Sequence, residues 1–178
     1  MDSTELKEQV SDAVQRREWL KQMKTTHQHE FVHDTQKDFI DLISFRLMNE
    51  IYAIPLIQLQ EILKAVNIMR VPRSHPHLKG IINVRGSILT VIDVRKRLGM
   101  DPGDIDATTR IVIVSEAGRA VGLLVDAVLE ILRIEKHQME QPPHGIPDQK
   151  RQFIAHIFND HDQFIIIPDL GKLCQFSL

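Results

Sequence analysis

Few residues of this chain could carry covalent or acid–base chemistry. The single cysteine, Cys174, lies in the stretch LCQFSL, where apolar neighbours favour a buried, inert thiol over a nucleophile. Asp93, Asp126 and Asp169 each end or follow an apolar run, which is typical of strand-end caps and turn formers. Five histidines lie in or beside loop-like stretches, where solvated imidazoles are expected: His75, His77, His137, His144 and His161.

The motifs that build catalytic or cofactor sites are also missing from the sequence. It has no G-x-G-x-x-G, no G-x-x-x-x-G-K and no H-E-x-x-H. His27, His29 and His33 could suggest a metal site, since His29 and His33 would share a helix face, but no cysteine or carboxylate cluster completes a tetrahedral set. We therefore expect no enzyme, no cofactor and no metal; an enzyme with an unrecognised site, or a kinase fragment, is the competing class.

Arg85 is a residue suited to the recognition of a partner. It follows Ile81-Ile82-Asn83-Val84 and precedes Gly86, which tolerates positive φ and breaks the apolar pattern before the β-branched run 88–92. Two short strands across this connection make a hairpin, with Asn83 and Arg85 as polar groups on an apolar ribbon. A guanidinium on a rigid turn can form a forked pair with a partner's carboxylate.

Composition limits the class of protein. The chain has 178 residues, 43% hydrophobic content and a net charge of −2, enough for a real core and unlike a basic nucleic-acid binder. No run approaches the ~20 apolar residues of a membrane span. The N-terminus MDSTELKEQ is too polar for a secretory signal, and a lone cysteine fits a reducing compartment. We expect a cytoplasmic protein.

The first 38 residues differ from the rest, so we predict a helical extension and polar linker over 1–38 and a β domain over 39–178. Apolar residues recur at three- and four-residue spacings over 3–24, which predicts an amphipathic helix that docks either on its own chain or on a partner. Residues 25–38 are polar and rich in histidine, and we interpret them as a solvated linker.

From Phe39 the pattern predicts strands, and it repeats. Residues 47–63 align with 115–132, where Ile54 meets Leu123 at an offset of 69, and 87–96 align with 163–172 at an offset of 76. The spacing of Leu56, Leu59, Ile62 and Leu63 predicts a short helix within the first copy. We expect each half of the sequence to curl into its own small barrel of about five strands, with the two barrels packed together.

Several ordered motifs resemble the CheW-like domains of bacterial chemotaxis. The pattern G-x-x-N-[LV]-R-G followed by D-[LV]-R appears as Gly80, Asn83-Val84-Arg85-Gly86 and Asp93-Val94-Arg95, and the similarity extends over roughly 39–178. Ala53, Thr90 and Ala155 depart from residues frequent in the family. The resemblance implies an all-β fold with short helices, in which two five-stranded SH3-like barrels surround a shared core, here with an added N-terminal helix.

The resemblance also implies a function and partners. CheW-like adaptors link the cytoplasmic tip of methyl-accepting chemoreceptors to the regulatory domain of the histidine kinase CheA. The alternative is an adaptor of a non-flagellar pathway, such as gliding or pilus control. A groove between segments 59–62 and 125–128 could hold a receptor helix. The expected receptor-binding residues are Leu59, Glu61, Gly80, Asn83, Arg85, Val125 and Val128; the kinase-facing residues are not assigned.

Overall fold

The computed structural model describes residues 38–65, 67–160 and 163–175. These belong to one compact unit, Asp38–Leu178. The helix expected over 3–24 and nearly all of the linker expected over 25–38 lie outside the described residues.

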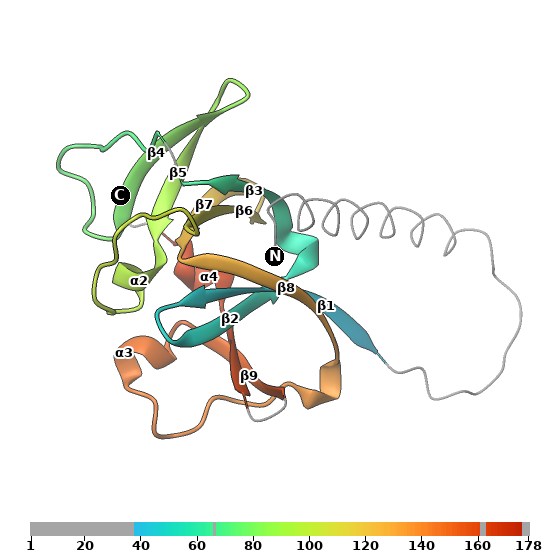
Figure 1. The fold of residues 1–178 in the computed structure, drawn as a ribbon. Coiled ribbons are helices and arrows are strands. Elements are labelled where there is room, and N and C mark those ends of the chain that lie inside the picture. The colour runs from blue at the N-terminus through green and yellow to red at the C-terminus, as the bar shows by residue number, and fades with distance from the viewer. Residues whose placement is uncertain (1–37, 66, 161–162, 176–178) are drawn as a thin grey trace, which may run out of the picture. The chain divides into compact units, whose positions relative to one another are not determined.

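The described chain is a succession of short strands with four-residue helices and 3₁₀ turns between some of them (Figure 1). The elements are β1 (Phe39–Leu47), β2 (Glu50–Pro55), η1 (Leu56–Gln58), β3 (Leu59–Lys64), β4 (Leu78–Val84), β5 (Ser87–Asp93), α2 (Val94–Arg97), β6 (Arg110–Glu116), β7 (Arg119–Val125), β8 (Ala127–Glu135), η2 (Lys136–Gln138), α3 (Asp148–Arg151), β9 (Ile154–Asp160), β10 (Gln163–Pro168) and α4 (Leu170–Leu173).

The strands form two five-stranded sheets of identical topology, in the orders β8-β1-β2-β10-β9 and β3-β6-β7-β5-β4. All pairings are antiparallel except one in each sheet, β2 with β10 and β5 with β7. The outer strand β4 receives an isolated bridge from Met69 to Ile81, and β9 receives the equivalent bridge from Glu140 to Ile157. The predicted pair of five-stranded subdomains is thus confirmed.

The assignment of one sheet to each half of the sequence is wrong. The first sheet takes β1 and β2 from the first copy of the repeat but β8, β9 and β10 from the second, and the other sheet does the reverse. The two copies are therefore intertwined. The parallel pairings between β2 and β10, and between β5 and β7, join strands of different copies, so neither sheet can form from one half alone.

The short helix predicted over 56–63 is mostly a strand. Only Leu56–Gln58 is helical, as one 3₁₀ turn after Pro55, and Leu59–Lys64 pairs with β6 as β3. A register shift between Leu59 and Glu61 interrupts the alternation of this strand. Such a bulge places two residues opposite one, so the apolar spacing of a bulged strand can mimic a helix.

Each sheet encloses its own apolar cluster. The first contains Leu42, Ala53, Ile134, Phe158, Ile165 and Ile167. The second contains Ala65, Ile82, Val91, Ile111, Ile113 and Leu124. Both clusters draw on both copies of the repeat, so burial of apolar surface holds the intertwined arrangement together.

Candidate interaction site

The predicted hairpin is confirmed, and its turn is well defined. In β4 and β5, Val84 pairs with Ser87, which leaves Arg85 and Gly86 as the two turn residues. Both have positive φ, 50° and 89°, as a type I′ turn requires. The Asn83 side-chain oxygen accepts a hydrogen bond from the Gly86 amide at 2.9 Å. Asn83 therefore acts in this structure as a brace for the turn that presents Arg85.

Arg85 and Glu61, 24 positions apart in the sequence, form an ion pair. The Arg85 Nη2 atom donates to Glu61 Oε1 at 3.1 Å, which places the two predicted residues in one site. The Arg85 side chain is 82% exposed and that of Glu61 is 32% exposed. Such an exposed pair contributes only about 0–1 kcal/mol to folding, but it orients the guanidinium and leaves other N–H donors for a partner.

The residue that sequence reasoning missed is Ile88. It lies opposite Asn83 in the β4–β5 ladder and is 71% exposed, the most exposed of the large apolar side chains that the structure describes. Its position next to the turn could have indicated this exposure. Ile88 lies at the start of β5, and β7 pairs with β5 only at residues 90–93. Arg85, Glu61, Asn83 and Ile88, which we call the hairpin site, combine charge with an apolar contact.

Gly80 lies on β4, the strand that carries Asn83, but is buried. A Cβ at this position would stand 2.3 Å from the Met69 carbonyl oxygen and 2.8 Å from an Ile68 methyl carbon. The expectation that backbone packs closely here is confirmed. Gly80 therefore allows the loop residue Met69 to pack against β4.

The remaining predicted residues are less exposed than Arg85. Leu59 and Val125 are 6% and 1% exposed, in β3 and β7, and Val128 is partly buried in β8 of the other sheet. A direct receptor contact by these three residues stays a prediction. A cavity of about 380 Å³ lies elsewhere, among residues such as Gln58, Glu116 and Gly171, and none of the predicted residues lines it.

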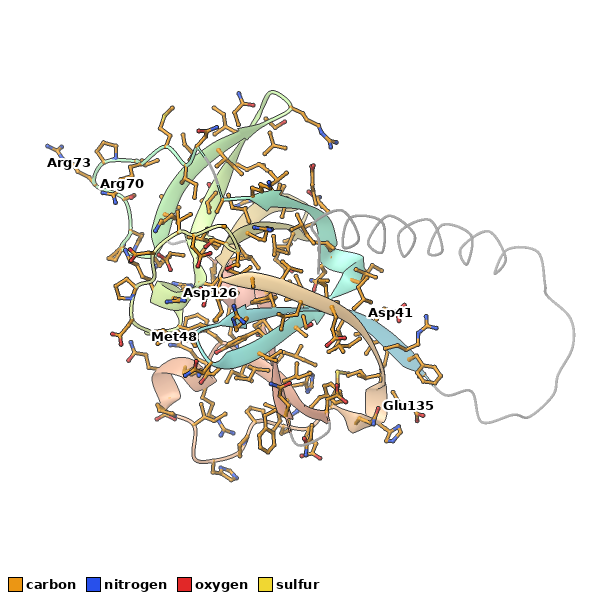
Figure 2. The ribbon with its side chains drawn as sticks, in the orientation of Figure 1. Asp41, Met48, Arg70, Arg73, Asp126 and Glu135 are labelled. Atoms are coloured by element: carbon orange, nitrogen blue, oxygen red, sulfur yellow. The ribbon has the colours of Figure 1, made fainter. Side chains whose placement is uncertain are left out.

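The aspartates have structural roles, as predicted. The Asp93 and Asp169 side chains accept hydrogen bonds from the first turns of α2 and α4. Asp126 accepts from the Met48 amide at 2.6 Å and pairs with Arg95 through both of its oxygens, and Figure 2 shows Met48 and Asp126 near each other. The three carboxylates therefore fasten short helices and turns.

Cys174 is buried, also as predicted. Burial, with a smaller contribution from the Glu116 carboxylate, raises the pKa of its thiol to about 12. In the described part of the chain, no group of three or more His, Cys, Asp or Glu residues is arranged to hold a metal ion. Within the same residues, no helix has the length and apolarity needed to span a membrane.

Comparisons with known proteins agree with this architecture. Residues 41–177 match the family model described as CheW-like domain. The chain is 32% identical to a probable chemotaxis protein CheW of Rhizobium etli over 75% of its length and 86% of that protein. It is 31% identical to the chemotaxis protein CheW of Bacillus subtilis, over 74% and 85%. The crystal structure of the scaffolding protein TtCheW from Thermoanaerobacter tengcongensis superposes with a TM-score of 0.73 at 32% identity, covering 84% of this chain and 96% of that one.

Proposed function

This chain belongs to the CheW-like domain family, and on that premise we propose that it couples methyl-accepting chemoreceptors to a CheA-type histidine kinase. Its role is that of a chemotaxis adaptor, without catalysis of its own, in the cytoplasm. Coupling is geometric: one surface holds the receptor tip and another holds the kinase's regulatory domain, so a change in the receptor alters the kinase through shared contacts.

The hairpin site carries the proposal for the receptor contact. Arg85 stands on a two-residue turn braced by Asn83, with Glu61 at 3.1 Å and exposed Ile88 opposite Asn83. A receptor helix can place a carboxylate on the guanidinium and an apolar side chain on Ile88, which is the usual combination of an apolar anchor with an orienting charge. The buried residues Leu59, Gly80 and Val125 would support this surface through strand packing, and the partly buried Val128 would extend it.

The test is quantitative binding of the purified protein to kinase and receptor fragments from the same genome. Arg85→Ala should weaken receptor binding about tenfold, equivalent to about 1.4 kcal/mol, with little change in thermal stability. Arg119→Ala is the matched control, since Arg119 is also an exposed arginine at a β-hairpin, where it directly follows a two-residue turn at the start of β7.

The outcomes separate the parts of the proposal. Loss of receptor binding in Arg85→Ala but not in Arg119→Ala supports both the partner and the site. If Arg85→Ala binds the receptor fragment as tightly as Arg119→Ala does, the hairpin site is not part of the receptor interface, but the adaptor role still stands. If the unmodified protein binds neither fragment at micromolar concentration, the coupling role itself must be given up.

A further inference from the structure

Charge is distributed unevenly along the chain. Residues 62–92 contain five Lys and Arg residues and no Asp or Glu, which leaves 17 Lys and Arg against 24 Asp and Glu in the rest of the sequence. This segment, which we call the basic lobe, comprises the second half of β3, the loop that follows it, and the β4–β5 hairpin up to the residue before Asp93. A chain with a net charge of −2 therefore has one strongly positive region.

Two of the five cations are paired with carboxylates that the structure describes. Lys79 lies 3.8 Å from Asp93, and Arg85 lies 3.1 Å from Glu61. Lys64, Arg70 and Arg73 are exposed and form no ion pair with any residue that the structure describes. Like charges kept together without counter-charges disfavour the isolated fold, so an external anion would stabilise the lobe.

The loop that carries Arg70 and Arg73 has a defined backbone. The Met69 amide and carbonyl pair with Ile81 of β4 at 2.9 and 2.8 Å, and the Ser74 hydroxyl donates to the Val71 carbonyl at 2.8 Å. Pro72 and Pro76 restrict the chain further. Figure 2 shows Arg73 projecting outward from this loop, with Arg70 on the same loop. Binding through them would therefore cost little backbone entropy.

An apolar side chain accompanies the two arginines. Met69, next to Arg70, is 68% exposed although its backbone is tied to β4. An exposed thioether in the same loop as two exposed arginines matches a short segment that carries both carboxylates and an apolar residue. A membrane surface or nucleic acid fits less well, since the rest of the chain has seven more acidic than basic residues and would be repelled by an extended polyanion.

We propose that the loop 67–76 is a docking surface for an acidic segment of a partner protein, in which Arg70 and Arg73 bind carboxylates and Met69 receives an apolar side chain. This inference does not depend on the receptor contact assigned to Arg85, because Arg85 lies on the β4–β5 turn and is already paired with Glu61.

The test uses the full chain and a fluorescent peptide of alternating glutamate and leucine, with glutamine replacing glutamate in a control peptide. Arg70→Glu/Arg73→Glu should weaken binding of the acidic peptide by at least about tenfold, and added salt should weaken binding to the unmodified protein. Lys96→Glu/Arg119→Glu makes the same change in net charge at two exposed cations outside the lobe and should alter binding less than about twofold. Thermal unfolding of each variant verifies that it is folded.

Three results would overturn the proposal. Equal weakening by both double variants would mean that only net charge is sensed, and equal binding of the glutamine peptide would exclude carboxylate recognition. Tighter binding to phosphatidylserine-containing vesicles or to single-stranded DNA than to the acidic peptide, with the same dependence on Arg70 and Arg73, would assign the loop to another class of partner.

Discussion

Asp93 and Asp169, 76 residues apart, perform the same task in the two sheets. Asp93 Oδ1 accepts a hydrogen bond from the Lys96 amide at 3.2 Å, and Asp169 Oδ1 accepts one from the Lys172 amide at 3.1 Å. Asp93 ends the inner strand β5 and Asp169 directly follows the inner strand β10, and each caps the four-residue helix that comes next. The two copies of the repeat therefore share capping chemistry as well as strand order.

Removal of either cap should destabilise the fold. Asp93→Ala and Asp169→Ala should each lower the free energy of unfolding by about 1 kcal/mol, the usual cost of losing a side-chain cap. The loss should be greater for Asp93, which is 4% exposed and also lies near Lys79. Chemical denaturation of the single variants measures both effects.

Asparagine substitutions separate the cap from the charge. Asp169→Asn retains an oxygen that accepts the amide hydrogen and should recover most of the stability lost in Asp169→Ala. If Asp169→Asn is as unstable as Asp169→Ala, charge and not capping accounts for the contribution of this residue.

Local chemistry made much of this fold predictable from the sequence. The hairpin followed from the glycine after Arg85 and the β-branched run behind it, and the aspartate caps followed from their places at the ends of apolar runs. In each case one short segment contains both the signal and the structure that it forms. The exposed pair of Arg85 and Glu61 brings residues 24 positions apart together, and resemblance to a family identified both.

The intertwining of the copies could not be read from the sequence. Alignment of 47–63 with 115–132 shows that the pattern repeats, but it does not specify whether β3 pairs with a strand of its own copy or with β6 of the other copy, as it does in the structure. The bulge between Leu59 and Glu61 also replaced the alternating pattern with helix-like spacing. Both features are set by partners distant in the chain, which a local pattern does not contain.

Two arginine–aspartate pairs offer a matched comparison of burial. Arg95 binds Asp126 through Nε and Nη2, with both side chains about 20% exposed; Arg133 binds Asp41 in the same two-point manner, with side chains 54% and 37% exposed. Arg95→Ala should cost about 1–3 kcal/mol of unfolding free energy, since it leaves a largely buried carboxylate without its cation. Arg133→Ala should cost less than about 1 kcal/mol.

The pair at Asp126 also joins separate parts of the domain. Asp126 accepts the Met48 amide at 2.6 Å, at the turn between β1 and β2, while Arg95 lies on α2. Asp126→Ala should therefore be more destabilising than Arg95→Ala, because it removes both interactions. Equal costs for Arg95→Ala and Arg133→Ala in urea unfolding would show that burial is not what distinguishes the pairs.

Gly80 should tolerate no side chain. In Gly80→Ala the new methyl group would lie 2.3 Å from the Met69 carbonyl oxygen, so either the bridge from Met69 to Ile81 breaks or the strand shifts. We expect a loss of about 1–3 kcal/mol in unfolding free energy, the usual range for overpacking. Gly145→Ala is the control, since a Cβ there meets no atom within 4 Å and its φ is not positive. Comparable stability of the two variants would contradict the close approach.

Asp106 gives the domain a defined response to acid. Its Oδ1 atom accepts hydrogen bonds from the hydroxyl and amide of Thr108, both at 2.7 Å, and from the corresponding groups of Thr109 at 3.1 and 3.0 Å. These bonds, led by that of the Thr108 hydroxyl, lower the pKa of the carboxyl group from 3.8 to about 2. Because the folded pKa is depressed, this stabilisation is present above pH 3.8 and is lost as the pH falls toward 2.

Asp106→Asn tests this response, since an amide oxygen can accept the same bonds but does not titrate. Above pH 3.8 the unmodified protein should be more stable than the variant, because a carboxylate accepts these bonds more strongly, and the difference should shrink as the pH falls to 2. Urea midpoints measured through that range give the difference directly. Asp101→Asn, at an exposed aspartate of the same loop, should show no such convergence. A constant difference between the unmodified protein and Asp106→Asn at every pH would mean that the carboxylate's charge is not what holds the loop, and that the geometry of the acceptor alone suffices.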